Sequence, residues 1–178
     1  RSYSEEHRYL DDGKATGFIK PYKNGYSLVA LLPNGDISLG DYVASMSGKA
    51  FIDTVKNAKD VPVETVIPKF SYDYDTEMSG ALKALGMPLP FDAAKADFSA
   101  LGASDSGNIF ISRVLHKAYI AVDEKGTKAG AATAVETILM SDTAGIYRVT
   151  LDRPFVYAII DDATGLPIFI GTVTELGK

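Results

Sequence analysis

A run of small residues between Gly126 and Ala134 constrains the fold of this chain more than any other stretch. Apart from Lys128, every residue in the run is glycine, alanine or threonine. These side chains are too small to form a core by themselves, and the glycines make a stable helix costly. The composition of the run, taken alone, therefore favours a surface loop.

The same run has a second interpretation, because its side chains alternate with the period of a β-strand. One face is small and uncharged and consists of Thr127, Ala129, Ala131, Thr133 and Val135. The other face carries the charges and consists of Lys128, Gly130, Ala132, Ala134 and Glu136. A strand can bury the first face without taking a charge out of water, which would be costly. The pattern is typical of a segment that is a loop in one state and a buried strand in another.

The rest of the chain predicts mainly strands. Residues 1–9 indicate an edge strand or a frayed end. Apolar or alternating stretches predict strands over 15–22, 26–32, 63–72, 108–122, 149–160 and 166–173. The Asn24-Gly25 pair predicts a hairpin turn between the first two of these strands. Residues 27–32 and 108–122 are apolar on both faces, which predicts that they lie centrally in a sheet.

Signals for helices are fewer. Cap and stripe patterns predict short helices over 39–46 and 48–58, the second capped by Ser47. A third helix is predicted to begin at Asp75 or Thr76 and to end at Gly86. Because there is no internal repeat and no linker, these elements predict one β-rich α+β domain over residues 1–178.

The composition argues against several classes of function. The chain has 178 residues, a net charge of −5 and no basic cluster, so nucleic-acid binding is not expected. No apolar run reaches membrane-spanning length, and no membrane partner is predicted. There is no cysteine, and His7 and His116 lie far apart without carboxylates at ligand spacing, so no metal and no other cofactor is predicted. Motifs of serine hydrolases are missing, and we predict no catalytic residues and no enzyme activity.

Three stretches together resemble the serpins, a family of conformationally trapping protease inhibitors. The first is Glu-Lys-Gly-Thr-Lys-Ala-Gly-Ala-Ala-Thr at 124–133, which is similar to the serpin hinge. The second is Val-Thr-Leu-Asp-Arg-Pro-Phe-Val-Tyr-Ala-Ile at 149–159, which resembles the signature that follows the reactive loop. The third is Leu-Pro-Ile-Phe-Ile-Gly-Thr-Val at 166–173, which is similar to the last serpin strand. The resemblance covers the chain, but only the C-terminal half of a serpin.

The resemblance implies a multi-sheet fold with main-sheet strands, a reactive-centre loop over 123–148 and a C-terminal β-hairpin. The implied hinge residues are Glu124, Gly126, Thr127, Ala129, Gly130, Ala131, Ala132 and Thr133. The implied signature residues are Asp152, Arg153, Pro154 and Phe155.

The hinge spacing of the family, counted from Glu124, implies a scissile bond between Met140 and Ser141. Residues 141–154 form a longer segment than in many serpins, so Leu139–Met140 is the alternative bond. Met and Leu are apolar and unbranched at Cβ, which suits proteases of the chymotrypsin, elastase or subtilisin type.

Two further residues match serpin positions outside the loop. Lys69 matches the lysine that pairs with the hinge glutamate, here Glu124, and would hold the hinge until the loop moves. His116 has two interpretations, because it is either a buried histidine with satisfied hydrogen bonds or the histidine of the serpin shutter region.

The function implied by the resemblance is suicide inhibition of a serine protease by insertion of the cleaved loop as a β-strand. The alternatives are a non-inhibitory binding or structural module, and an inactive half-serpin that needs an N-terminal partner chain. The family also implies that the protein is secreted and acts outside the cell or at the cell surface.

Overall fold

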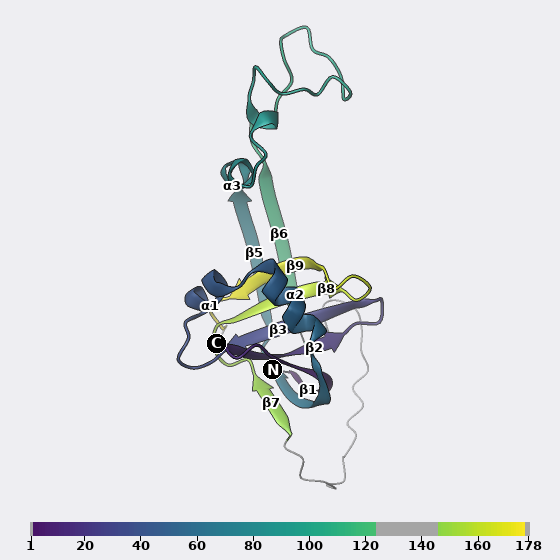
Figure 1. Ribbon diagram of the computed structural model, residues 1–178, viewed down its shortest axis with the longest axis vertical. Coiled ribbons are helices and arrows are strands. Elements are labelled where there is room, and N and C mark those ends of the chain that lie inside the picture. The colour runs from purple at the N-terminus through teal and green to yellow at the C-terminus, as the bar shows by residue number, and fades with distance from the viewer. Residues whose placement is uncertain (1, 124–145, 177–178) are drawn as a thin grey trace. The chain divides into compact units, whose positions relative to one another are not determined.

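The computed structural model of the chain (Figure 1) describes residues 2–123 and 146–176. The chain divides into two compact units, one formed by residues 1–70 with 121–178 and the other by residues 71–120. The single domain inferred from the sequence stays a prediction.

The first unit contains a seven-stranded sheet with the order β7-β4-β1-β2-β3-β8-β9. Its strands are β1 (Ser2–Asp11), β2 (Ala15–Pro21), β3 (Tyr26–Pro33), β4 (Lys59–Ile67), β7 (Tyr147–Thr150), β8 (Phe155–Asp161) and β9 (Pro167–Val173). Neighbouring strands are antiparallel except β4 and β7, which are parallel. The hairpins predicted at Asn24-Gly25 and between 160 and 166 are confirmed.

One part of the core of this unit lies between the sheet and two short helices, α1 (Leu39–Ser45) and α2 (Gly48–Lys56). The oxygens of Ser38 and Ser47 accept the backbone N–H groups of Asp41 and Ala50 and cap the helices. The buried side chains of this core include Leu10, Ile19, Leu31, Tyr42, Phe51, Val55, Val156 and Ile160. The predicted helices and the central position of residues 27–32 are therefore confirmed.

One glycine is required for the close approach of β2 and β3. A Cβ atom at Gly17 would lie 2.0 Å from the backbone oxygen of Ala30, far inside van der Waals contact. No other residue type fits at this register without moving the backbone of the neighbouring strand.

The second unit contains most of β5 (Phe70–Glu77) and β6 (Leu115–Val122), which pair as a two-stranded sheet. A short helix, α3 (Ser79–Ala84), follows β5, and a single 3-10 turn, η1 (Leu89–Phe91), lies in the segment that leads to β6. Lys117 of β6 and Asp75 of β5 form a cross-strand ion pair at 2.6 Å.

The structure corrects the sequence predictions for the strands in four places. The single strand predicted over 149–160 is divided into β7 and β8 at residues 151–154. The strand predicted over 1–9 is β1, which runs to Asp11 and lies between β2 and β4, so it is neither an edge nor a frayed end. The single strand predicted over 63–72 is divided into β4 and β5 at residues 68–69. The strand predicted over 108–122 begins only at Leu115, and much of β6 is exposed rather than central.

Local hydrogen bonds explain the late start of β6. The Asn108 amide nitrogen donates to the backbone oxygens of Ala93 and Ala96 at 3.0 and 2.8 Å, and the Ile111 N–H donates to Pro90. Asn108 and Ile111 are therefore engaged with the preceding loop instead of a strand ladder.

The helix predicted to begin at Asp75 or Thr76 begins at Ser79, with Met78 at the N-cap position and the Glu77 carboxylate bonded to the first helical residue. Glu77 Oε1 accepts the backbone N–H of Ser79 at 2.8 Å and also the Ser79 hydroxyl. The Val114 N–H approaches the same oxygen at 3.4 Å. The hydrogen bond from the Ser79 hydroxyl, followed by that from its backbone N–H, holds the pKa of Glu77 below its ordinary value.

The lowered pKa of Glu77 predicts a loss of stability in acid. The folded state favours the charged carboxylate, so its stabilisation is complete above the ordinary pKa and disappears as the pH falls through the lower, folded value. Glu77→Gln should flatten the fall of the urea midpoint as the pH drops below about 5. Asp73→Asn, which removes a charge from the same strand, is the control. An unchanged acid slope in Glu77→Gln would show that the hydrogen bonds from Ser79 to this carboxylate do not stabilise the fold.

Candidate functional site

The candidate site is built around the attachment points of the predicted reactive loop. The structure describes the chain up to Asp123, just after β6, and again from Ile146, just before β7. Most of the predicted site residues lie outside the described residues: Glu124, Gly126, Thr127, Ala129, Gly130, Ala131, Ala132, Thr133, Leu139, Met140 and Ser141. Tyr147 and Arg148, the last residues of the predicted loop, belong to β7.

A short edge strand follows the loop segment. Tyr147 to Thr150 pair with Val63 to Val66 of β4, and the Leu151 N–H extends this pairing with a 2.9 Å hydrogen bond to the Val66 oxygen. The Val149 side chain is buried under the strand, whereas Arg148 faces solvent. The strand is only four residues long, so the contacts of its side chains decide how firmly it is held.

An aromatic stack and an ion pair strengthen this attachment. The rings of Tyr147 and Tyr9 lie 4.2 Å apart between centroids, and the Lys59 ammonium lies 5.6 Å from the Tyr9 ring and 6.0 Å from the Tyr147 ring. The Arg148 guanidinium donates to Oε2 of Glu64 at 2.8 and 2.5 Å. Burial, followed by the charge of Asp11, raises the pKa of Tyr9, so the phenol stays neutral.

Tyr147→Ala is expected to loosen β7 from β4. Aromatic pairs of this kind contribute about 0.5–1.5 kcal/mol beyond the burial of their area. The amide protons of Val149 and Leu151 should therefore exchange with solvent a few-fold to about ten-fold faster. Ile146→Ala is the matched control, because Ile146 lies at the same end of β7 with its side chain exposed. Equal exchange in the two variants would show that the stack does not hold the strand.

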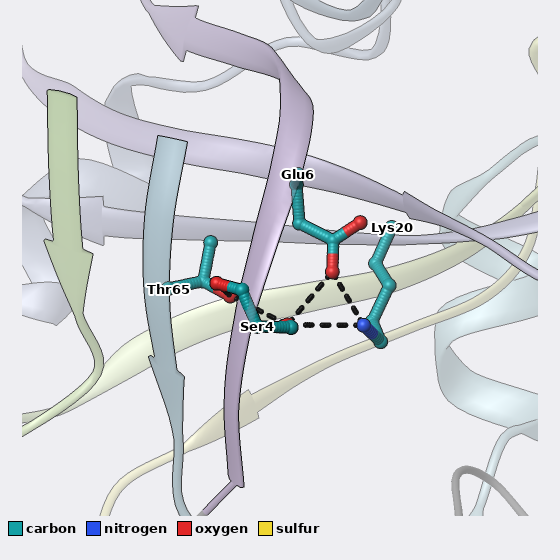
Figure 2. A network of polar contacts seen from close by, with 4 residues as sticks. All are labelled: Ser4, Glu6, Lys20 and Thr65. Atoms are coloured by element: carbon teal, nitrogen blue, oxygen red, sulfur yellow. Dashed lines mark hydrogen bonds and ion pairs between the residues drawn. The ribbon is translucent and has the colours of Figure 1, made fainter. Parts of the chain in front are cut away.

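A buried polar network (Figure 2) joins three strands of the large sheet. Ser4 and Glu6 come from β1, Lys20 from β2 and Thr65 from β4; Glu6 and Thr65 are 7% and 2% exposed. The Lys20 ammonium donates to Glu6 Oε1 and to Ser4 Oγ, the latter at 3.0 Å. The Ser4 hydroxyl donates to Glu6 at 2.8 Å and lies 2.9 Å from the Thr65 hydroxyl, which donates to the Ser4 backbone oxygen at 3.0 Å.

This network fixes the strand to which β7 is attached. Thr65 is the register partner of Val149, so the hydroxyl that closes the network belongs to the residue beside the buried anchor of β7. In the described part of the chain, every buried side-chain nitrogen or oxygen atom has a hydrogen-bond partner. The network was not predicted, although the alternation of Ser4 and Glu6 with exposed residues of β1 was a signal that could have revealed it.

The predicted signature residues connect β7 to β8. One Arg153 nitrogen donates to the Pro33 backbone oxygen at 2.8 Å, and another lies 3.2 Å from Asp152. The Phe155 side chain is buried, and its ring packs edge-on against Phe70 at 5.7 Å between centroids. Pro154 stands directly before β8. The structure brings Arg153 and Phe155 into the fold of the sheet, and their family role stays a prediction.

The described residues do not test the family roles predicted for Lys69 and His116. Lys69 lies between β4 and β5, and its predicted partner Glu124 is outside the described residues, so the pairing stays a prediction. His116 is exposed on β6, where its ring lies 6.4 Å from that of Tyr74. The interpretation of His116 as a buried histidine is wrong, because β6 pairs only with β5 in the described part of the chain. The shutter role stays a prediction.

Two other kinds of site find no support in the described residues. They contain no group of three or more His, Cys, Asp or Glu side chains that could hold a metal ion. Within residues 2–123 and 146–176, no helix is long and apolar enough to cross a membrane.

The described residues form a β-rich scaffold with few helices, built around one seven-stranded sheet. A family model described as serpin (serine protease inhibitor) matches residues 2–176, and the chain belongs to the serpin family. Serpins are generally inhibitors of proteases and not enzymes. The predicted membership and the serpin-like, β-rich fold are therefore confirmed.

Similar proteins come from distant organisms. Serpin-Z2B of Triticum aestivum is 32% identical over 97% of this chain and 46% of its own length. Intracellular coagulation inhibitor 2 of Tachypleus tridentatus is 31% identical over 84% of this chain and 36% of its own length. The chain thus spans less than half the length of these relatives.

Solved structures agree with this assignment. The thermophilic serpin tengpin in its native state is 51% identical, with a TM-score of 0.86 over 98% of this chain and 45% of that protein. Tengpin in its latent state is 50% identical, with a TM-score of 0.81. Thyroxine-binding globulin in complex with thyroxine has a TM-score of 0.76 at 24% identity, which is a likeness of fold alone.

Proposed function

We propose that this chain supplies the reactive loop and its supporting strands to a suicide inhibitor of a serine protease. The observation that carries the proposal is the loop segment itself. Its hinge sequence would have one small, uncharged face if it formed a strand, and the described strand after the loop is held by the buried Val149 and the Tyr9–Tyr147 contact. A loop with one fixed end and an insertable hinge is suited to strand insertion.

The proposed chemistry begins with attack of the protease serine on the backbone carbonyl of Met140, with Ser141 as the leaving amine. The cleaved loop then inserts as a strand before water can release the acyl-enzyme. Serpin loop insertion is itself a known example of strand addition and of released strain, so this step comes from the family. Bulky, charged or proline-containing hinges would oppose insertion, and this hinge has none of these on its inner face.

The apolar residue at the proposed bond sets the class of target. Met140, or Leu139 if the register is displaced by one residue, suits the hydrophobic primary pocket of a chymotrypsin-, elastase- or subtilisin-type protease. The compartment is a separate question, because one relative is named as an intracellular inhibitor. Secretion and extracellular action therefore stay a prediction.

A second proposal concerns the partner that the inhibitor needs. β9 is the outer strand of the sheet, and four large apolar side chains at its start are 41–55% exposed: Leu166, Ile168, Phe169 and Ile170. An exposed apolar group of this kind marks a surface that another protein segment covers. We propose that the N-terminal half of a serpin fold covers it, and that inhibition requires this half.

The experiment supplies the partner. The protein is mixed with a polypeptide that provides the N-terminal half and then with chymotrypsin- and elastase-type proteases, and the products are separated on denaturing gels. A covalent band at the summed mass of protease and cleaved inhibitor is expected only when both halves are present. Cleavage without such a band in the reconstituted protein would favour the non-inhibitory alternative, and a band with this half alone would contradict the need for a partner.

Mass spectrometry of the released peptide locates the bond. A peptide that begins at Ser141 is expected. One that begins at Met140 would support the alternative bond, and one that begins at Val149, after the exposed Arg148, would contradict both.

A further inference from the structure

The asparagine residues of the protein differ in how easily their side-chain amides can react with the backbone nitrogen of the next residue. There are four of them, Asn24, Asn34, Asn57 and Asn108, and the first two are each followed by glycine. A glycine at the next position leaves its backbone nitrogen unshielded, because it has no Cβ and moves freely. That nitrogen can then reach the amide carbon, Cγ, of the asparagine.

The surroundings of Asn34 oppose this reaction. Its amide nitrogen Nδ2 donates to the Gly13 oxygen at 3.2 Å, and its backbone N–H donates to the Lys14 oxygen at 2.8 Å. Its own backbone oxygen accepts the Ile37 N–H at 2.9 Å. These three bonds hold the amide away from Gly35, so cyclisation requires local opening first.

The surroundings of Asn24 leave its amide group exposed to solvent. It lies in the exposed turn between β2 and β3, which is closed by a 2.7 Å hydrogen bond from the Tyr22 N–H to the Tyr26 oxygen. No hydrogen bond to the Asn24 amide group occurs within the part of the protein that the structure describes. Gly25 has φ +78°, and the position of a Cβ there has no atom within 4 Å. Nothing in this turn restrains the amide group or covers it.

We propose that Asn24–Gly25 is a site of spontaneous deamidation. The Gly25 nitrogen attacks Cγ of Asn24 and forms a new C–N bond, while its proton passes to solvent. The bond between Cγ and Nδ2 of Asn24 breaks, and the nitrogen leaves as ammonia after taking a proton from water. Water then adds to either carbonyl of the resulting succinimide and opens it to aspartate or isoaspartate. The inference is independent of the proposed inhibitory function.

The reaction should weaken the sheet locally, because the turn is tied to the β8–β9 connection. The Gly25 oxygen accepts the Asp162 N–H at 2.9 Å, and the Ser27 hydroxyl donates to the Asp162 carboxylate at 2.6 Å. The product adds a carboxylate beside Asp161 and Asp162, where like charges repel. Isoaspartate also lengthens the backbone within a turn whose ends are fixed by the Tyr22–Tyr26 bond.

The test follows both asparagines in the same molecule. The protein is kept warm at mildly alkaline pH, and peptide mapping by mass spectrometry measures conversion over time. Asn24 should convert at least about ten-fold faster than Asn34, since the latter must first break its hydrogen bonds. In urea the rates should become similar, because only the shared Asn-Gly sequence remains. Equal rates without urea, faster conversion at Asn34, or no conversion at Asn24 would overturn the proposal.

A variant at Asn24 tests whether deamidation of this turn weakens the sheet. Asn24→Gln keeps an amide but enlarges the ring that would have to form, so conversion should stop at this position. The urea midpoint of the original protein should fall during incubation, whereas that of Asn24→Gln should stay constant. Equal falls in both proteins would show that conversion at this turn does not weaken the sheet.

Discussion

Replacing Thr127 by Arg is expected to turn the reconstituted inhibitor into a substrate. In the proposed hinge, Thr127 is the first residue of the small, uncharged face, so insertion as a strand would begin by burying it. An unpaired guanidinium at this position would cost several kcal/mol to take out of water. Folding should be unaffected in the uninserted state, where the guanidinium can remain in water. Insertion would then be slower than hydrolysis of the acyl-enzyme, and active protease would be released.

The measurement is the number of inhibitor molecules consumed for each protease molecule trapped. This number should rise strongly in Thr127→Arg, with cleavage still at the same bond. Lys128→Arg is the matched control, because residue 128 belongs to the charged face and the change should leave trapping unaltered. If Thr127→Arg traps as efficiently as this control, the alternation of the hinge does not describe an inserted strand.

Glu6→Ala is expected to cause a large loss of stability. It leaves the Lys20 ammonium with only the Ser4 hydroxyl as a partner in the network (Figure 2). Removing one member of a buried ion pair costs about 3–5 kcal/mol. Since 29% of the Lys20 side chain is exposed, we expect a loss near the lower limit, about 3 kcal/mol.

Urea unfolding at neutral pH measures this loss. Lys49→Ala is the control, because it breaks a pair with Asp53 whose side chains are 84% and 48% exposed and should change stability by about 0–1 kcal/mol. The double variant Glu6→Ala/Lys20→Met should recover part of the loss, since no buried charge is left unpaired. Equal losses for Glu6→Ala and Lys49→Ala would show that the network does not stabilise the sheet.

Sequence patterns correctly predicted those strands and helices whose burial and capping in the fold follow the same patterns. The apolar stretch 27–32 became the buried strand β3, and Ser47 caps α2 as expected. The predicted starts of α3 and β6 were wrong because a polar side chain forms hydrogen bonds that replace the expected backbone hydrogen bonds. Glu77 moves the start of α3 to Ser79, and Asn108 keeps the residues before Leu115 out of the ladder. Both hydrogen bonds join residues that hydrophobic periodicity and secondary-structure propensity treat as independent of each other.

The candidate site was predicted less completely than the fold, because its contacts depend on register between distant strands. A register shift between Glu6 and Arg8 interrupts the alternation of β1. Strict alternation would bury Arg8, whereas the shift buries Tyr9, which can then stack on Tyr147. Sequence shows which residues share a face only while the strand is regular, so this stack could not be predicted. The hinge and the scissile bond stay predictions from the resemblance.

The strand order has a consequence for the protein while it is being made. Strands β1, β2 and β3 form a local meander that is complete at Pro33, but β3 pairs on its other side with β8, where Leu31 lies opposite Val156. At a synthesis rate of about 5–20 residues per second, the open edge of β3 waits about 6–25 seconds for its partner. An apolar strand with free backbone groups is prone to pair with another polypeptide during that time. A ribosome-bound chaperone that covers this edge should therefore raise the yield of folded protein more than one that acts after release from the ribosome.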